Sequence, residues 1–535
     1  MSLRRLAIAA FSLSAGVSSV RAEPVQKASL TVPSNYTGNL DTIKQIFNTT
    51  YAAYLQYAFP RDELLPLTKN GTDDLFGWSA TIADGLDTMW ILGYTDLFEQ
   101  GVDQIAKTNF NVSAGEQVGG LPGDQAYLFD ATIRYIAGFL SAYELSGQKY
   151  PVLVEKAKEI ADNMAYAWVD GNKMPYNTVY LGNHSVQVDS TNVAQVGTLT
   201  LEWGLLSNYT NNATYRHLVE ESVLYLASLP DPLNGIPAQA LWPNGTFIGD
   251  YVTWSGGTDS YLEYLIKYAR LTNTDDNTYA DTWATAVDSS IDKLLKRSTV
   301  DNWLYLADYT NKTILHVGSH LGCFYGGNWI LGGKMLNNDT IYNYGLELTD
   351  ACFNTYYGTA TGIGPETFAY ISSDGNYTGS NITAQEVAFY NEHGYYVTDP
   401  GYYQRPEVLE SNFYAWRATG DTKYLDNAVE ALNAFQKYLP STVGWACLNN
   451  VTDVHGTQYN EQEAYFFAEV LKYLYLTFDD PSNISIDEYV FNTECHPFKA
   501  PAAKSQYGSG KLNAPSQQPF ETTSGPIPEV SSSHN

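Results

Sequence analysis

The sequence has few basic residues for its length. It contains 29 Lys and Arg residues against 58 Asp and Glu residues, and its formal net charge is -29 at pH 7. Binding to a nucleic-acid backbone depends on clustered Lys and Arg side chains, so this balance argues against a nucleic-acid partner. Carbohydrate or cation partners agree better with the charge. The hydrophobic content of 44% is nevertheless enough for a large buried core.

Long apolar runs are absent after the N-terminus. The first residues combine Arg4 and Arg5 with an apolar run from Leu6 to Val20 and a small residue, Ala22, which is the pattern of a cleaved signal peptide. A retained membrane anchor needs roughly 20 continuous apolar residues, whereas this run is short and interrupted by serines and a glycine. We therefore expect a signal peptide over residues 1–22 and no membrane association after its cleavage.

Sites for N-glycosylation are frequent, and their density indicates a glycosylated protein of the secretory route. The Asn-x-Ser/Thr sequons are at Asn35, Asn48, Asn70, Asn111, Asn183, Asn208, Asn212, Asn244, Asn311, Asn338, Asn376, Asn381, Asn450 and Asn483. The chain does not end in a retention tetrapeptide such as Lys-Asp-Glu-Leu, so we expect a secreted protein. Action within the secretory pathway and action after export are both compatible with these features.

Cysteine is scarce. The chain has only Cys323, Cys352, Cys447 and Cys495. In an oxidising compartment four cysteines permit three pairings, and the spacing does not choose among them. None of the spacings resembles that of a zinc site.

Helical periodicity dominates the rest of the chain, because apolar residues recur at i, i+3 and i+4. An aromatic-rich helix, a polar break and a second helix recur over 133–150, 199–215, 261–279 and 409–424. Such hairpins cannot bury their apolar faces alone, so they must stack as an open superhelix or a closed toroid. Long Gly- and Pro-rich connections favour a toroid whose loops build a site at one end. We expect one all-α domain over 23–498 and a disordered tail, rich in Ser, Pro and Gly, over 499–535.

Acidic residues beside aromatic residues are the informative polar groups. Asp259 and Glu263 are four positions apart and would share a helix face, and Glu407 and Glu410 are three apart at a helix start. For Glu407 alone, a favourable interaction with the helix dipole, about 0.3–1 kcal/mol, would be a sufficient explanation. The two pairs together instead require a cation, a proton or a polar ligand between the acids.

Further acids have a similar setting. Asp130 precedes Arg134 by four positions; a surface ion pair is the simplest interpretation, although the apolar neighbours favour a buried role. Glu366 follows a proline in a loop, and Glu463 and Glu469 flank three aromatic residues. Spacing alone thus predicts a carboxylate-rich toroid suited to general acid/base chemistry on sugars.

Six segments carry a resemblance to a known family. They are DELLP at 62–66, TIADGLDT at 81–88, DSYLEYL at 259–265, RPEVLES at 405–411, AEVLKYLY at 468–475 and FNTECHP at 491–497. From about Ile43 to His496, the chain resembles glycoside hydrolase family 47, the class I α-1,2-mannosidases. The resemblance implies a single (α/α)7 barrel with the active site at its base. It also implies an inverting mechanism, in which one carboxylic acid protonates the departing oxygen and a carboxylate about 6.5–9.5 Å away activates water.

The resemblance also implies roles for individual residues. Glu407 matches the general base, Asp259 and Glu366 match further catalytic carboxylates, and Asp130 stands at the position of a family acid. The residues implied to line the sugar subsite are Arg134, Glu202, Glu263, His320, Arg405, Glu410, Tyr465 and Glu469. The family usually has glutamate at the position of Asp130, so proton transfer here would need a bridging water, a backbone shift or a loss of rate. We expect the water bridge.

Calcium is the cofactor that the resemblance implies. The family holds the ion through the hydroxyl and carbonyl oxygens of one threonine, which is Thr493 here, and waters and sugar hydroxyls complete the shell. Glu494 and nearby acids would neutralise the ion mostly through water. The family's disulfide matches Cys323 and Cys352, and by exclusion the other two cysteines are candidates for a second bridge.

The resemblance therefore implies a secreted, calcium-dependent exo-α-1,2-mannosidase that trims high-mannose N-glycans as a monomer. One alternative is a catalytically weak, mannose-binding quality-control relative with the same barrel, which only an activity measurement separates. Another is a different toroidal glycosidase that acts on plant or fungal polysaccharide. The Thr493 motif argues against this second alternative.

Overall fold

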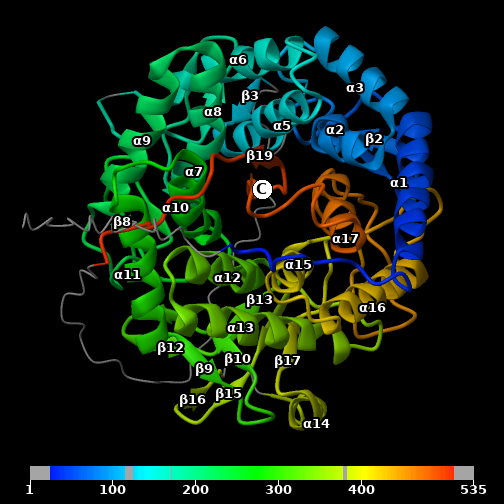
Figure 1. Cartoon of the computed structure of the whole chain (residues 1–535), viewed down its shortest axis with the longest axis vertical. Helices are drawn as coiled ribbons and strands as arrows, with labels where there is room; N and C mark the ends of the chain where they lie inside the picture. The colour runs from blue at the N-terminus through cyan, green and yellow to red at the C-terminus, as the bar shows by residue number, and fades with distance from the viewer. Residues whose placement is uncertain (1–23, 115–123, 170, 378–381, 511–535) are drawn as a thin grey trace, which may run out of the picture.

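The computed structural model describes residues 24–114, 124–169, 171–377 and 382–510. Its helices form a double ring around a central axis (Figure 1). Among the described residues, seven helices make the inner ring: α2 (Ala80–Leu92), α5 (Ala137–Leu145), α8 (Thr200–Thr210), α10 (Asp259–Thr272), α12 (Tyr325–Met335), α15 (Glu407–Thr419) and α17 (Leu471–Phe478). The predicted signal peptide lies outside the described residues.

Each inner helix packs against an outer helix that is its partner in a hairpin or, for α17, the first helix of the chain, and some inner helices also contact a second outer helix. In the same order, the outer helices are α3 (Thr95–Lys107), α6 (Val152–Met164), α9 (Ala213–Ala227), α11 (Thr278–Lys293), α13 (Asp339–Tyr357), α16 (Lys423–Tyr438) and α1 (Gly38–Tyr57). The first outer helix of the chain thus packs against the last inner helix, and the ring closes where the segment before α17 contacts α2. The expected all-α class and the (α/α)7 barrel are confirmed.

The two rings differ in how they bury their residues. Every residue of α10 from Ser260 to Leu271 is buried, because this helix has the cavity or core on all sides. The outer helix α16 instead buries Tyr424, Leu425, Ala428 and Leu432, which recur with helical spacing along one face. A helix that is apolar on one stripe only is the element expected at the surface of a globular domain.

Two inner helices begin with a π-helical segment. The chain passes from α4 (Leu128–Asp130) through the π-helix η1 (Ala131–Ile136) into α5, and through the π-helix η4 (Phe466–Val470) into α17. Such segments are rare and occur frequently at functional sites. Here η1 carries Arg134 and η4 carries Glu469.

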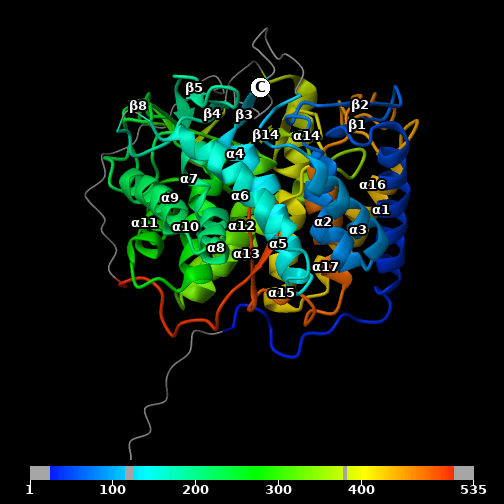
Figure 2. The same cartoon turned by 90° about the horizontal axis from the view of Figure 1, so that it is seen from above.

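Short strands occupy the connections, many of them at one end of the barrel (Figure 2). The sheets of the described residues are β1 (Glu63–Leu65) with β2 (Asn70–Thr72); β3 (Gln125–Tyr127), β4 (Thr178–Tyr180) and β5 (Ser185–Val186); β6 (Thr191–Asn192), β7 (Ala240–Leu241) and β8 (Phe247–Ile248); β9 (Leu295–Arg297) with β10 (Leu304–Leu306); β11 (Asp308–Thr310) with β12 (Thr313–Leu315); β13 (Val317–Ser319), β14 (Thr367–Ala369) and β17 (Tyr396–Asp399); and β15 (Ile371–Ser372) with β16 (Gly375–Asn376). All pairs are antiparallel. The remaining short helices are η2 (Ala165–Ala167), α7 (Val193–Gly197), η3 (Leu321–Phe324) and α14 (Ala384–His393).

A C-terminal hairpin reaches the middle of the ring. Its strands are β18 (Tyr489–Phe491) and β19 (Pro497–Lys499), and β19 lies at the centre of the ring in Figure 1. Asn492 shapes the tip, because its side-chain oxygen accepts hydrogen bonds from the backbone N–H groups of Glu494 at 3.0 Å and His496 at 2.8 Å. This turn presents Thr493 to the interior of the barrel.

The folded domain extends beyond the expected boundary at residue 498. Arg270 donates to the carbonyl of Pro501 at 2.8 Å, and Lys504 donates to the carbonyl of Thr274 at 2.7 Å. Tyr507 is buried and donates to Asn273 at 2.8 Å. The predicted start of the disordered tail at 499 is therefore too early, since these contacts attach the chain to the barrel. Residues 511–535 lie outside the described residues.

The cysteines form one bridge. Cys323 and Cys352 are disulfide-bonded, with their Cα atoms 5.9 Å apart, as the resemblance implied. The second candidate pair is wrong, since Cys447 and Cys495 are both free and buried. Cys495 lies in the central hairpin, whereas Cys447 pairs through its backbone with Glu461, so the two belong to separate parts of the molecule.

Among the described helices, none is both long and apolar enough to cross a bilayer.

Candidate active site

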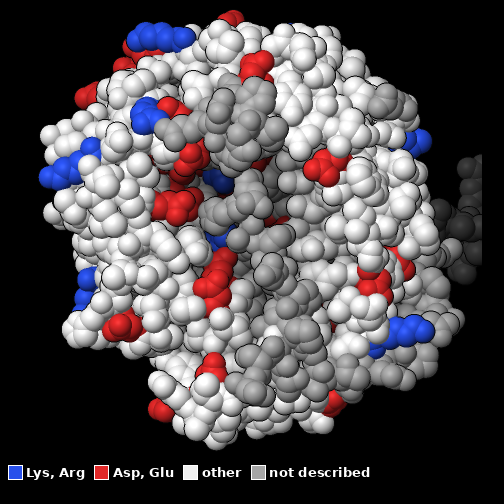
Figure 3. Space-filling view, turned by 180° about the vertical axis from the view of Figure 1, so that it is seen from behind, with Lys and Arg blue, Asp and Glu red and all other residues white. Residues whose placement is uncertain are grey.

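A cavity of about 560 Å³ lies inside the barrel. Its walls come from the inner helices and from the strand-bearing connections, with the tip of the C-terminal hairpin between them. The face opposite to the one in Figure 1 is hollowed near its centre, and Asp and Glu side chains gather around the hollow (Figure 3). The volume lies within the range of small-molecule sites, about 300–1,000 Å³.

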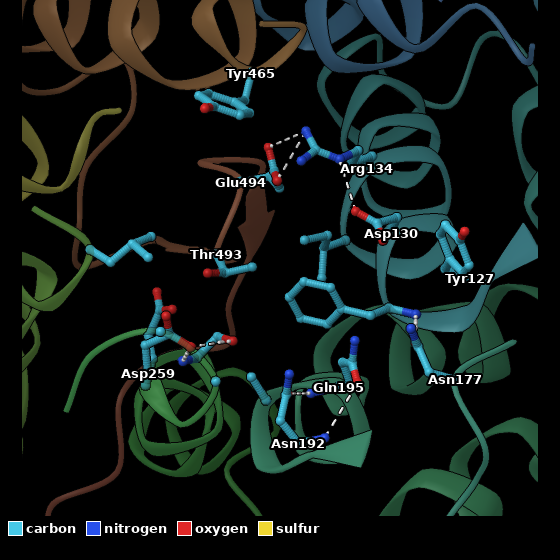
Figure 4. A pocket seen from close by; sticks show the side chains of 18 of the residues that line it. Tyr127, Asp130, Arg134, Asn177, Asn192, Gln195, Asp259, Tyr465, Thr493 and Glu494 are labelled. Carbon is cyan, nitrogen blue, oxygen red and sulfur yellow. Dashed lines mark hydrogen bonds and ion pairs between the residues drawn. The ribbon is translucent and has the colours of Figure 1, made fainter. Parts of the chain in front are cut away.

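One wall carries Asp130 and Arg134. The two residues are on successive turns of one helix, and Arg134 Nε lies 3.5 Å from an oxygen of Asp130. Arg134 also pairs with Asp84 at 3.1 Å and with Glu494 at 3.2 Å, and it faces the ring of Tyr465 (Figure 4). Burial raises the pKa of Asp130, and Arg134 offsets only part of that effect.

Another wall carries Glu407, the first residue of α15. One of its oxygens lies 2.6 Å from His320 Nδ1, and the other ring nitrogen of His320 lies 2.7 Å from the hydroxyl of Tyr356. Burial alone would raise the pKa of Glu407, but the hydrogen bond and charge of His320, together with Arg405, hold it below its ordinary value. Glu407 is therefore ionised at neutral pH.

Asp259 begins α10 and lies across the cavity from Asp130, with Thr493 between them (Figure 4). Its carboxylate accepts a hydrogen bond from the backbone N–H of Ser260 at 2.8 Å. Burial, with a smaller contribution from the charges of Glu263 and Glu407, raises the pKa of Asp259 to about 7. Asp259 is therefore able to hold a proton in mildly acidic solution.

The floor of the cavity is built around Thr493. Its backbone N–H lies 3.3 Å from the hydroxyl of Tyr264, and that hydroxyl donates to Glu202 at 2.5 Å. Asn492 Nδ2 donates to the same oxygen of Glu202 at 3.0 Å. These contacts fix the position of the Thr493 backbone in the cavity wall.

Further acids surround Thr493. Glu263, Glu410, Glu469 and Glu494 all line the cavity, and the buried ammonium group of Lys267 pairs with Glu263 and lies 3.8 Å from Glu410. Burial and neighbouring carboxylates raise the pKa values of Glu410 and Glu469. Burial also raises the pKa of Glu494 to about 8, although Arg134 opposes this. So many acids around one cavity create a site for a cation or for hydrogen-bond donors.

Comparison with known proteins identifies this arrangement. Residues 46–500 match the family model of glycosyl hydrolase family 47. The chain belongs to glycosyl hydrolase family 47.

Family 47 relatives resemble most of the chain. It is 35% identical over 483 residues to a probable mannosyl-oligosaccharide α-1,2-mannosidase 1B of Aspergillus niger, which covers 86% of this chain and 91% of the relative. It is 34% identical over 484 residues to a mannosyl-oligosaccharide α-1,2-mannosidase of Coccidioides posadasii, with 86% and 90% covered. The structure of an α-1,2-mannosidase from Trichoderma reesei matches with a TM-score of 0.82 and 34% identity, covering 87% of this chain and 99% of that one.

Most of the residues predicted from the family 47 motifs meet in the cavity, but three do not line it. The predicted residues that do line it are Asp130, Arg134, Asp259, Glu263, Arg405, Glu407, Glu410, Tyr465, Glu469 and Thr493. Glu366 instead accepts from Arg405 Nε through both oxygens, at 2.8 and 2.9 Å. His320 and Glu202 likewise stand behind Glu407 and Tyr264. Glu366 and His320 thus contact residues that line the cavity, and Glu202 holds Tyr264 and Asn492 beside Thr493; that the three contact a ligand themselves stays a prediction.

The outer part of the cavity contains residues that sequence reasoning missed. Its polar lining includes Gln125, Tyr127, Asn177, Gln187, Asp189, Asn192 and Gln195. Asn192 and Gln195 form a capping box at the start of α7, and their spacing in the sequence indicates only a helix start. The strand-bearing connections bring these amides together, so their common position follows from the tertiary fold.

Proposed function

We propose that the protein is a secreted, calcium-dependent exo-α-1,2-mannosidase that removes terminal mannose from high-mannose N-glycans with inversion. The family 47 membership and the names of the relatives support the activity. The observation that carries the mechanism is the contrast within one cavity, where Glu407 has a lowered pKa while Asp130 and Asp259 have raised pKa values. Carboxyl groups whose pKa values are driven apart in this way supply the base and the acid of a hydrolysis.

Glu407 acts as the general base. It accepts a proton from the water that attacks the anomeric carbon, and its contact with His320 keeps it ionised and fixes its direction. The remaining nitrogen of His320 is held by Tyr356, so the ring cannot turn away. A positioned base of this kind contributes about 10²–10⁴ to the rate.

Asp130 supplies the proton to the departing glycosidic oxygen. Its side chain reaches less far than that of a glutamate, so the proton passes through one bridging water. This bridging water is distinct from the attacking water, for which the separation of the two carboxyl groups leaves room in inverting glycosidases. Asp259 is the next candidate donor, because it lines the same cavity and has a pKa of about 7. Glu366 is disfavoured as donor, since Arg405 occupies both of its oxygens.

The floor of the cavity fits a calcium ion. Thr493 supplies hydroxyl and carbonyl oxygens, and the surrounding acids offer further oxygens and negative charge, which is the donor set that Ca²⁺ prefers. One oxygen of Glu202 is buried without a hydrogen-bond partner, next to the contacts that hold Thr493. When bound there, the ion would hold neighbouring hydroxyls of the sugar and help to distort its ring. Lys267 partly neutralises the charge of Glu263, and Arg134 partly neutralises the charges of Asp84 and Glu494.

The test is incubation with a labelled nine-mannose glycan, with product mapping and a chelator control. We expect successive release of single mannose residues, loss of release after removal of calcium, and recovery when calcium is added back. The circular dichroism spectrum should keep most of its helical signal without calcium, because few protein groups hold the ion. Full turnover after verified metal removal would exclude the calcium role. Tight glycan binding with no mannose release would instead favour the mannose-binding quality-control alternative.

Secretion is a separate part of the proposal. Every sequon asparagine within the described residues is exposed or half-buried, so the folded surface is compatible with glycans at these positions. Expression in a eukaryotic secretory host should release protein that begins near residue 23 and loses mass on enzymatic deglycosylation. An unprocessed N-terminus on cell-retained protein would contradict this part alone.

A further inference from the structure

A second group of metal-ligand side chains includes one residue of the cavity wall, Glu463, and does not include Thr493. Cys447, Glu461 and Glu463 place one ligand atom each within 4.8 Å of one another. Cys447 and Glu463 are buried, and Glu461 is half-buried. Within the described residues, no other three His, Cys, Asp or Glu side chains meet in this way.

The backbone holds this group in place. The N–H of Cys447 donates to the carbonyl of Glu461 at 3.1 Å, and the N–H of Tyr459 donates back to the carbonyl of Cys447 at 2.9 Å. Glu461 and Glu463 are two positions apart in an extended segment, so their side chains share one face, while Gln462 points the other way and accepts from the N–H of Trp445. The three ligand groups therefore converge through backbone pairing.

The group also has an unsatisfied acceptor. Glu463 is only 5% exposed, and one of its carboxylate oxygens is buried without a hydrogen-bond partner. Buried carboxylates normally find a partner, because an unpaired one costs free energy. The neighbouring arginines make no hydrogen bond to this oxygen: Arg405 donates to Glu366 through Nε, with another of its guanidinium nitrogens also buried without a partner, and Arg134 pairs with Asp84 and Glu494. Burial and the neighbouring acids raise the pKa values of both Glu463 and Cys447.

We propose that Cys447, Glu461 and Glu463 form a second metal site, which binds Zn²⁺. A thiolate favours zinc over calcium or magnesium, and two carboxylates complete three protein ligands, with water in the fourth position. Zinc lies about 2.0–2.3 Å from such ligands, so the group must close slightly around the ion. Half-buried Glu461 has the freedom to make this movement. Binding displaces the thiol proton of Cys447, and any proton held by the two carboxyl groups, into solvent, so affinity rises with pH.

The site communicates with the active-site cavity. Glu463 lines that cavity together with Arg405 and Tyr465, so an ion can enter from the cavity. A bound zinc ion would add charge beside Arg405, which stands two residues before Glu407. We therefore expect zinc to lower turnover of glycan even when calcium is saturating.

The experiment uses the full folded protein in saturating Ca²⁺, which occupies the Thr493 region. Titration with Cd²⁺, a spectroscopic substitute for Zn²⁺, should produce one equivalent of the ultraviolet thiolate-to-metal absorption band. Zn²⁺ should abolish this band by competition, and calorimetry should show release of a proton that increases below the thiol pKa. Metal binding is measured without glycan, so its failure is distinct from failure of the proposed hydrolytic function.

Two variants and one matched control decide the assignment. C447S should lose the band, and E461Q should weaken Zn²⁺ binding at least about tenfold. C495S removes the other free, buried cysteine and should keep both the band and the affinity. Persistence of the band in C447S, its loss in C495S, or unchanged zinc affinity in E461Q would each overturn the proposal. Should C447S fail to fold, E461Q and C495S still decide it.

Discussion

Two walls of the same cavity shift the pKa values of their carboxyl groups in opposite directions. Glu407 starts a regular α-helix, lies 2.6 Å from His320 and has a lowered pKa. Asp130 ends a short helix at the start of a π-helical segment, has Arg134 at 3.5 Å as its one ionic partner among the described residues, and has a raised pKa. The difference lies in the neighbours, since both side chains are carboxylates at the edge of the same cavity. One wall is built to hold a charge and the other to hold a proton.

The backbone differs between the walls as well. Pro406 precedes Glu407, so the helix start is conformationally restricted, and the residue before it, Arg405, is tied to Glu366. The Asp130 wall instead continues into the π-helix η1, a rare form that is frequent at functional sites. In the proposed mechanism the base, Glu407, is therefore oriented by more neighbours than the acid, Asp130, whose exact position would matter less if a water bridges it to the substrate.

The largest expected effect comes from removing the charge on the first wall. In Glu407→Gln the amide keeps the shape but cannot accept the proton of water, so turnover should fall by about 10²–10⁴. Glycan affinity should change little, because the other cavity residues remain. The checks are kcat on an α-1,2-linked mannobiose and calorimetric binding of a high-mannose glycan. Near-normal turnover would remove Glu407 as the base and erase the contrast between the walls.

At the second wall, we expect turnover to be lost in Asp130→Asn and largely kept in Asp130→Glu. Asp130→Asn should lose turnover by about 10² or more, since the amide cannot donate an acidic proton to the glycosidic oxygen. Asp130→Glu should keep most of the activity, because a longer acid reaches the same oxygen directly or through water. Both are measured on the same disaccharide, with the Asp259→Asn variant alongside. If Asp130→Asn retains wild-type turnover and Asp259→Asn does not, Asp259 supplies the proton.

The sequence anticipated the barrel and the floor of the site better than the roles within it. The apolar patterns of period 3.6 are local and predicted the helical hairpins. The resemblance to family 47, and not the spacing, singled out Thr493, which lines the cavity. The sequence did not show that Glu366 lies behind Arg405 and outside the cavity lining, because this position depends on a contact between residues 39 positions apart. The same holds for Asn192 and Gln195, whose local signal is a helix cap although they also line the cavity.

A smaller effect concerns pH. Plotted against pH, activity should follow a bell-shaped curve, because Glu407 must be ionised and the proton donor must be protonated. The acidic limb therefore reports a pKa below the ordinary value of glutamate, and the alkaline limb reports a raised carboxyl pKa, about 7 if Asp259 is the donor. In His320→Asn the base loses the hydrogen bond and charge that lower its pKa, so its acidic limb should move to higher pH. A hydrogen bond to a charged group is worth about 1.5–3 kcal/mol, or about one to two pKa units. An unmoved acidic limb would show that His320 does not set the ionisation of Glu407.

The smallest effect on turnover is expected from the disulfide that supports the Glu407 wall. Cys323 follows His320 by three residues and links its segment to α13 through Cys352. On the chain-entropy estimate, closing a loop of this length contributes about 3–4 kcal/mol, so the paired change to alanine should lower the free energy of unfolding by that amount in denaturant titrations. Turnover of the folded variant should stay within about twofold, because His320 keeps its contacts with Tyr356 and Glu407. If the acidic limb moves instead as it does in His320→Asn, the bridge orients the histidine, and the rigidity of this wall depends on the covalent link as much as on the hydrogen bonds.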